Sequence, residues 1–192
     1  MQSQSWVATL VFALIAFAGG YFAGSYGPPS VSGGQGVTTA TPRDAACYFS
    51  PRGGCTQAII SEIGTAQHSI ELEGYCFTSR PIGDALLAAR RRGVNVTLVL
   101  DAAQTSEHRQ EARELTRAGV LVYLDASHAV SRNQVILIDN LTVIAGSFDF
   151  IAAADETNAE NILILRNHSQ LQSAYQDNFL GHLKHSQAFD GS

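Results

Sequence analysis

Apolar residues from Cys47 onward switch repeatedly between the 3.6-residue spacing of a helix and the two-residue spacing of a strand. Such an alternation, with short connections, is typical of an α/β sandwich whose mixed, largely parallel sheet is flanked by helices. Pro81 stands near a predicted helix start, while Gly93 and Gly119 each follow a helix where a left-handed residue is favoured. The predicted elements are helix 56–67, strand 69–77, helix 81–92, strand 94–100, helix 107–118, strand 120–124, a hairpin within 132–150, strand 161–165 and helix 171–184.

The start of the chain has a different composition. The first charged side chain is Arg43, and residues 6–23 form an apolar run just long enough to span a bilayer. This run predicts export, either as a cleaved signal peptide or as an uncleaved anchor, and the missing basic residues before it favour the anchor. We therefore expect an anchor or signal at 1–23, a Gly/Ser/Pro/Thr-rich linker at 24–46, a folded domain at 47–187 and a tail at 188–192. The expected location is extracytoplasmic (periplasmic), membrane-anchored or secreted.

The charge of the chain argues against one class of function. A net charge of −5 with 12 basic residues excludes a high-affinity, sequence-independent binder of polyanions. The basic run Arg90-Arg91-Arg92 ends a predicted helix, where cations complement the helix dipole, and this favours a structural role over phosphate contacts.

Three cysteines carry separate predictions. Cys47 and Cys55 flank a predicted turn, and in an oxidising compartment we expect a disulfide to close it. Cys76 is interpreted as a small buried hydrophobic residue. No His or carboxylate stands at ligand spacing around it, so no metal is expected there and no cofactor is expected anywhere.

The hairpin concentrates the polar residues of an otherwise apolar region. A two-residue turn at Asp139-Asn140 would pair Ile138 with Leu141, Gln134 with Ala145 and Arg132 with Ser147. Arg132, Gln134 and Ser147 would then converge at its open end, while Asp139 would be a turn residue at the far tip.

Residues 47–187 resemble the phospholipase D superfamily, specifically its small, exported, single-motif Nuc-type endonucleases. The resemblance is carried by "FTSRPI", "RGVNV", "VILIDN", "GSFDF" and "AEN", which occur in this order. It implies a phospholipase D-like α-β-α sandwich with one motif copy per chain, acting as a metal-independent phosphodiesterase. In that family two copies of His-x-Lys-x4-Asp, followed by Gly-Ser-x-Asn, face each other across a dimer interface. One His attacks phosphorus, the other protonates the leaving alcohol, and a downstream Glu orients the imidazole.

The match to this motif is incomplete. Asp139, Gly146, Ser147 and Glu160 fit the pattern, with Ser147 and Gln134 left to contact a substrate phosphate and Gly146 in a structural role. Three positions depart from it. Arg132 stands at the place of the nucleophilic His, Gln134 at that of the Lys and Asp149 at that of the Asn.

These departures remove reactive groups. A guanidinium stays protonated and serves neither as nucleophile nor as proton shuttle. We instead predict that Arg132 forms an ion-pair cluster with Asp149 and Glu160, since a buried unpaired carboxylate is costly. A divalent metal on these two carboxylates is disfavoured by the adjacent Arg132 cation.

Replacement nucleophiles are poorly supported. His128 lies four residues before Arg132 and is interpreted as an ordinary polar residue. A partial copy of the motif, His182-x-Lys184 followed by Asp190-Gly191-Ser192, is interpreted as accidental because its spacing is wrong and it falls near a helix end.

Two functions therefore remain open. The first is an exported, catalytically impaired binding or scaffold subunit, forming a homodimer or a heterodimer with an active relative and attached to the membrane by its first segment. The second is an active metal-independent phosphodiesterase that hydrolyses nucleic acid or phospholipid. The ordered motifs disfavour an unrelated α/β module.

Overall fold

A computed structural model describes residues 44–103 and 109–191. All described residues belong to one compact unit, Gly36–Ser192. The predictions for residues 1–43, an anchor or signal peptide and most of the linker, lie outside the described residues. Within 44–103 and 109–191, no helix is both long and apolar enough to cross a membrane.

Helices and strands alternate along the described chain as the periodicity predicts, and most bounds differ from the prediction by one to three residues. The elements are β1 Ala45–Phe49, α2 Cys55–Thr65, β2 Ser69–Gly74, α3 Arg80–Arg91, β3 Asn95–Asp101, α4 Gln110–Arg117, β4 Leu121–Asp125, β5 Val135–Ile138, β6 Thr142–Gly146, α5 Ala152–Glu156, β7 Asn161–Arg166, α6 Ser169–His185 and β8 Gln187–Ala188. Pro81 lies in the first turn of α3, and Gly93 and Gly119 have φ angles of 95° and 84°, as expected for residues that end helices.

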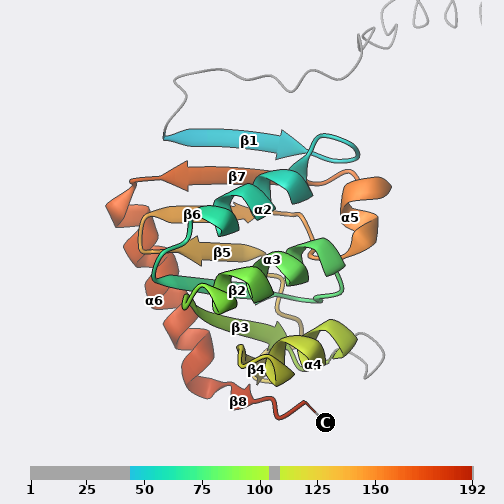
Figure 1. Cartoon of the computed structure of the whole chain (residues 1–192), viewed down its shortest axis with the longest axis vertical. Helices are drawn as coiled ribbons and strands as arrows, with labels where there is room; N and C mark the ends of the chain where they lie inside the picture. Colours follow the sequence, from blue (N-terminus) through green and yellow to red (C-terminus); the bar gives the residue numbers. More distant parts are fainter. Residues whose placement is uncertain (1–43, 104–108, 192) are drawn as a thin grey trace, which may run out of the picture. The chain divides into compact units, whose positions relative to one another are not determined.

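All the strands form one mixed sheet in the order β1-β7-β6-β5-β2-β3-β4-β8 (Figure 1). Neighbouring strands are parallel only from β2 through β3 to β4. The hairpin β5–β6 joins the edge of this parallel group antiparallel to β2, and β7, β1 and β8 also pair antiparallel. The α/β sandwich with a mixed sheet is confirmed, while its parallel part is limited to β2–β4.

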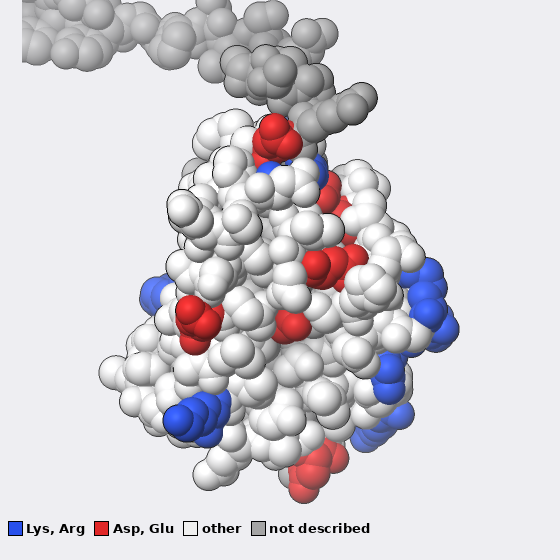
Figure 2. Space-filling view, turned by 90° about the vertical axis from the view of Figure 1, so that its left-hand side faces the viewer, with Lys and Arg blue, Asp and Glu red and all other residues white. Residues whose placement is uncertain are grey.

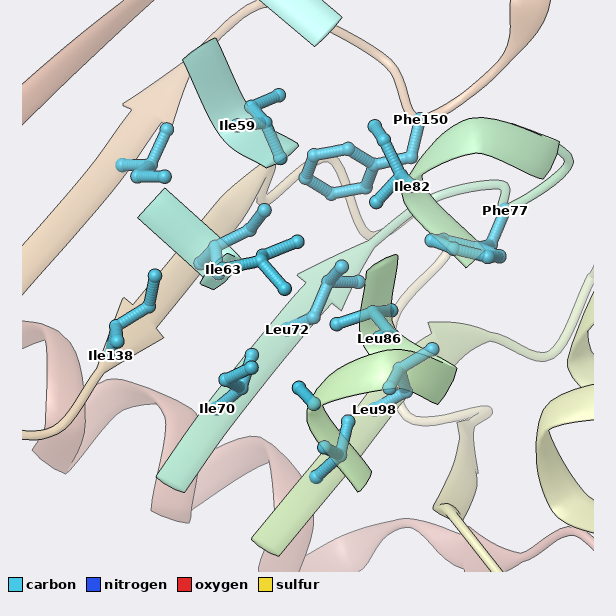
Figure 3. Close-up of a cluster of buried hydrophobic side chains, with 14 of the residues drawn as sticks. Ile59, Ile63, Ile70, Leu72, Phe77, Ile82, Leu86, Leu98, Ile138 and Phe150 are labelled. Atoms are coloured by element: carbon cyan, nitrogen blue, oxygen red, sulfur yellow. The ribbon is translucent and has the colours of Figure 1, made fainter. Parts of the chain in front are cut away.

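Helices cover both faces of the sheet, which makes three layers. Figure 1 shows α2, α3 and α4 in front of the sheet and α6 crossing behind it. The larger core lies between the sheet and α2, α3 and α4, and Figure 3 shows its isoleucine, leucine and phenylalanine side chains meeting there. A smaller cluster joins the other face to α6 and consists of Val99, Val135, Leu137, Val143 and Phe179.

Three short elements were not predicted. β1 lies partly within the expected linker, α5 within an expected loop, and β8 at the start of the expected tail. β8 pairs with β4, and Phe189 directly after it is 8% exposed. Each of these elements is too short for a periodic pattern, so pairing and packing with distant residues are what define them.

The predicted turn of the hairpin is correct, but its register is wrong by one residue. Asp139 and Asn140 have φ angles of 54° and 55°, and the Leu141 N–H donates to the Ile138 carbonyl at 2.9 Å. Ile138 nevertheless pairs with Thr142, and Val135 with Ala145. Leu141 is therefore an extra residue, and its carbonyl accepts a 2.8 Å hydrogen bond from the Asn167 N–H.

The predicted disulfide is also wrong, because all three cysteines are free. Cys47 is exposed on β1, whose alternate residues Ala46 and Tyr48 pack against the larger core. Cys55 is fully buried within that core, so the two side chains lie on opposite sides of the sheet. Burial raises the pKa of Cys55 to about 11. Cys76 is buried as predicted, and burial raises the pKa of its thiol as well.

Candidate functional site

Most of the predicted site residues meet at one edge of the sheet. Gln134 directly precedes β5, Gly146 ends β6, and Glu160 directly precedes β7. β5 and β7 both run antiparallel to β6, so the start of each lies beside the end of β6. Tyr75 follows the end of β2, the other neighbour of β5, and reaches the same edge.

A buried amide and a carboxylate form the centre of this site. Gln134 is 6% exposed, and its Nε2 donates a hydrogen bond to Asp149 Oδ1. Gln134 Oε1 is buried without a hydrogen-bond partner. Burial, followed by the nearby Glu160 carboxylate, raises the pKa of Asp149, while Arg132 and the Gln134 hydrogen bond act in the opposite direction. The site thus holds negative charge at some energetic cost.

The predicted ion-pair cluster of Arg132 is wrong. Arg132 is exposed, and its guanidinium carbon lies 5.3 Å from the centre of the Tyr75 ring, in a cation–π contact. Among the described residues, no ion pair within 4.0 Å joins Arg132 to Asp149 or Glu160. The prediction failed because it left out Gln134. The neutral Gln134 amide already donates a hydrogen bond to the Asp149 carboxylate, so Asp149 has a partner without an ion pair to Arg132.

Ser147 and Gly146 join β6 to the start of β7. Ser147 Oγ accepts hydrogen bonds from the backbone N–H of Asn161 at 3.2 Å and from its side-chain amide at 3.3 Å. A Cβ atom on Gly146 would lie 2.1 Å from the Asn161 carbonyl oxygen, which is closer than any real contact. Glycine is therefore required at 146 by the close approach of two backbones.

Asp139 lies at the opposite end of the hairpin, as predicted, and contacts none of these residues. Its carboxylate accepts hydrogen bonds from the backbone N–H groups of Gln67, His68 and Ser69 at 2.7, 2.7 and 2.8 Å. It fixes the loop between α2 and β2 to the hairpin turn. The sequence identified Asp139 as a turn residue but gave no sign of this loop contact.

Comparison with known proteins matches residues 59–183 to the family model described as "Cardiolipin synthase, PLD-like domain". The chain is 35% identical over 156 residues to a protein of Rickettsia bellii named phospholipase D, covering 81% of this chain and 77% of the relative. The chain belongs to the phospholipase D superfamily.

Two solved structures share its fold. Nuc from Salmonella typhimurium, a phospholipase D family member, is 28% identical with a TM-score of 0.73, over 76% of this chain and 97% of Nuc. NucT from Helicobacter pylori superposes with a TM-score of 0.67 at 20% identity, over 76% of this chain and 98% of NucT, and supports the fold alone. The family and fold predicted from the ordered motifs are confirmed.

A second polar cluster of this phospholipase D domain was not predicted. Asp125 ends β4, His128 follows three residues later, and His182 and His185 lie in the last turn of α6. Asp125 Oδ2 lies 2.8 Å from His182 Nδ1, 3.1 Å from His185 Nε2 and 3.8 Å from His128 Nε2. The three imidazole rings pack together, with centroids 4.9 to 5.5 Å apart.

A buried glutamate supports this cluster. Glu73 on β2 is 2% exposed, and its Oε1 accepts a 2.9 Å hydrogen bond from the Asn133 side chain and lies 3.4 Å from His182 Nδ1. Burial raises the pKa of Glu73, while Asn133, His182 and Ser131 lower it. Burial also acts to raise the pKa of Asp125, but hydrogen bonds from His182, the Ser127 backbone and His185 hold it at about 2.

The sequence contained a signal for this cluster. Asp125-x-x-His128 and His182-x-x-His185 both have a spacing of three residues, and on a helix that spacing places two side chains on one face. The signal was missed because the two halves lie 57 residues apart and the second half was interpreted as an accidental copy of the motif. His182 does lie at a helix end, as that interpretation required, but its imidazole contacts Asp125, His128 and His185 there.

Proposed function

We propose that this chain is an exported phospholipase D-fold subunit that no longer hydrolyses phosphodiesters and acts by binding or scaffolding. The observation that carries the proposal is the hydrogen-bonded pair of Gln134 and Asp149. In the motif that the sequence resembles, a Lys and an Asn occupy these two places. A neutral amide bonded to a carboxylate supplies no cation for a phosphate and adds an anion in its place.

The residue at the nucleophile position supports the same conclusion. Arg132 is exposed and stacked over Tyr75, and its guanidinium stays protonated at any working pH. It therefore offers no lone pair to attack phosphorus and no proton to a leaving alcohol. Asp149 and Glu160 lie close enough for the Glu160 charge to raise the pKa of Asp149, and two neighbouring carboxylates disfavour a bound phosphodiester.

The proposal includes a location and a partner. The apolar run at 6–23 supports export, with the segment kept as an anchor or removed as a signal peptide. The superfamily places two motif copies across a dimer interface, and one copy per chain supports a homodimer or a heterodimer with an active relative. A heterodimer would also lack one of the two histidines, so this chain would inhibit or scaffold its partner.

The test compares the full-length protein with the triple variant Arg132→His, Gln134→Lys, Asp149→Asn, without metal. Both are assayed on a chromogenic phosphodiester, on single-stranded DNA and on phospholipid vesicles. The expected result is turnover by the variant alone, because the three changes restore a nucleophile, a cation and a neutral amide on an intact scaffold. A matched control, Gln134→Lys alone, restores the cation without a nucleophile and should stay inactive.

The second candidate function, an active phosphodiesterase, is favoured by the 35% identity to the Rickettsia bellii protein named phospholipase D. It predicts that the natural protein turns over one of these substrates and that Arg132→Ala leaves the rate unchanged. That result would overturn the proposal and would require another nucleophile. His128→Gln and His182→Gln variants would then be the first to assay.

A further inference from the structure

Asp125, His128, His182 and His185 offer one ligand atom each, and these four atoms all lie within 4.8 Å of one another. We propose that this cluster is a structural zinc site that joins the end of α6 to the loop after β4. The site uses none of the motif residues, so zinc binding can be measured separately from phosphodiesterase activity.

The ligand set matches the preferences of Zn²⁺. Three imidazole nitrogens and one carboxylate oxygen provide the nitrogen and oxygen ligands that zinc accepts, in the number that completes a tetrahedral structural site. Ligand atoms around a tetrahedral zinc lie roughly 3.4 Å apart, given metal–ligand distances of about 2.0–2.2 Å. Asp125 Oδ2 already lies 2.8 to 3.8 Å from the three histidine nitrogens. Small side-chain rotations would complete the geometry.

The backbone holds the ligands in place on both sides. The Ser127 N–H donates a 2.8 Å hydrogen bond to Asp125 Oδ1, which leaves Oδ2 directed at the histidines. On α6, Ser186 Oγ donates to the His182 carbonyl at 2.7 Å, just after the last helical turn. A helix C-terminus carries partial negative charge, which favours a cation at this position.

The charge balance also favours a dication. Asp125 is 3% exposed and Glu73 2% exposed, and the ion-pair partners of both are histidines. Zinc binds imidazole in its neutral form, so a bound Zn²⁺ would itself supply the positive charge beside these two buried carboxylates. Without an ion, three histidines compete for a single carboxylate oxygen that accepts few hydrogen bonds.

All four ligands of the site come from the protein, and two of them are exposed to solvent. The side chain of His182 is 13% exposed, while those of His185 and His128 are 39% and 46% exposed. An ion can therefore enter beside the two outer histidines. Four protein ligands leave no open position for a substrate, which indicates a structural rather than a catalytic metal.

Glu73 and Asn133 form a second layer around these ligands. Asn133 Nδ2 contacts Glu73 Oε1 at 2.9 Å and His182 Nε2 at 3.3 Å. Asn133 lies between the two motif positions 132 and 134. Zinc binding would therefore hold the segment that leads into β5 as well as the end of α6.

The proposal is tested on the full-length protein after its metals have been removed with a chelator. Zinc is then titrated in competition with a chelating dye, and bound metal is measured by elemental analysis after dialysis. We expect one Zn²⁺ per chain, no displacement by Mg²⁺, and a higher melting temperature in the zinc-loaded protein. With Co²⁺ in place of zinc, we expect the intense visible absorption of a tetrahedral ion without the charge-transfer band of a thiolate ligand.

Variants of the outer histidines connect this binding to the cluster. His128→Gln and His185→Gln should each weaken zinc binding by more than roughly 100-fold. Loss of a second-layer partner weakens metal binding by up to about that factor, and loss of a ligand should cost more. Glu73→Gln should weaken it by about 10–100-fold. His168→Gln is the matched control, because His168 lies exposed before α6 and outside the cluster, and it should bind zinc unchanged.

Two results would overturn the proposal. One is a stripped wild-type protein, folded by circular dichroism, that takes up well below one zinc per chain. The other is unchanged zinc affinity in both outer-histidine variants, which would place the metal elsewhere on the chain.

Discussion

The single carboxylate of Asp139 accepts hydrogen bonds from three backbone N–H groups of a loop that lies 70 or more residues away in the sequence. Burial alone would raise the pKa of Asp139, but these hydrogen bonds hold it below its ordinary value of 3.8. The stability that the ionised carboxylate contributes is therefore present above pH 3.8 and is lost as the pH falls through the lower, folded-state pKa.

Asp139→Asn should lower the free energy of unfolding at pH 7 by about 2–3 kcal/mol, because an amide is a weaker acceptor and one of its two groups is a donor. The loss should shrink below pH 3.8. Urea unfolding of the variant and the wild type at several pH values measures both effects. Asp84→Asn is the control, because Asp84 makes an exposed ion pair with Arg80 and should change stability by less than about 0.5 kcal/mol. Equal effects of the two substitutions would contradict the prediction.

Gly146→Ala should destabilise the domain by about 3 kcal/mol or more, since its Cβ would meet the Asn161 carbonyl oxygen at 2.1 Å. Thermal unfolding is the measurement. Gly181→Ala is a matched control in α6, where a Cβ meets nothing within 4 Å and alanine should add roughly 0.5–1 kcal/mol. Opposite signs for the same chemical change would confirm that backbone contact at 146 decides the effect.

Asp149→Asn should stabilise the domain at pH 7, by about 1 kcal/mol, because the carboxylate is buried beside Glu160. The pKa of Asp149 is raised in the folded state, so its ionisation lowers stability as the pH rises from 3.8 through that pKa. The two proteins should have similar stability below pH 3.8 and diverge above it, as measured by chemical denaturation across that range. A variant less stable than the wild type at pH 7 would show that the charge is favourable where it lies.

Among the elements, the arginine run at the end of α3 illustrates how neighbouring helices are joined. Arg92 donates to the Ile63 and Ala66 carbonyls at 2.9 and 3.3 Å, at the end of α2, and Arg90 donates to the Gly119 carbonyl at 2.9 Å. These contacts supply donors to carbonyl groups at or just beyond helix ends, where the helix itself provides few, and the Ile63 carbonyl also accepts from the Ala66 N–H at 3.3 Å. The structural role predicted for the run is thus directed at other elements rather than only at its own helix dipole.

Arg92→Met should therefore cost about 1–2 kcal/mol of unfolding free energy, since it removes the Arg92 donor from the Ala66 carbonyl and one of the two donors from the Ile63 carbonyl. Arg91→Met, next in the run and exposed, should cost less than about 0.5 kcal/mol. Guanidinium unfolding of both variants gives the comparison. A larger loss for Arg91→Met would mean that the charge of the run, not its hydrogen bonds, matters.

The elements also show what the sequence could and could not predict. Long periodic segments such as α3 and β3 were predicted because packing repeats along them. β1 and β8 depend on pairing with distant strands, and Leu141 at the register shift bonds to Asn167 beyond the hairpin, which no local pattern records. The same distinction between local pattern and distant contact holds for the site. The motif positions were found from their order in the sequence, but the Gln134–Asp149 hydrogen bond and the histidine cluster depend on contacts between separate parts of the fold.

For the whole molecule, charge sets an expectation about nucleic acid. The net charge is −5, and on the face shown in Figure 2 acidic residues are spread over the middle while most of the basic residues lie along the right-hand edge. We expect single-stranded DNA to bind with a Kd weaker than roughly 0.1 mM at physiological salt, the weak end of non-specific binding. Fluorescence anisotropy with a labelled oligonucleotide measures this. A micromolar Kd with a steep salt dependence would contradict it and would favour a nucleic-acid substrate.

Asp139 and Gly146 hold backbone together, whereas Arg132 stands exposed on a tyrosine ring. Evolution would therefore act on these positions by different rules. Selection for a stable fold would be enough to keep Asp139 and Gly146 unchanged through any change of function. Position 132 has no such protection. In a lineage in which hydrolysis no longer mattered, this position would be free to drift, and the chemistry would be lost long before the shape.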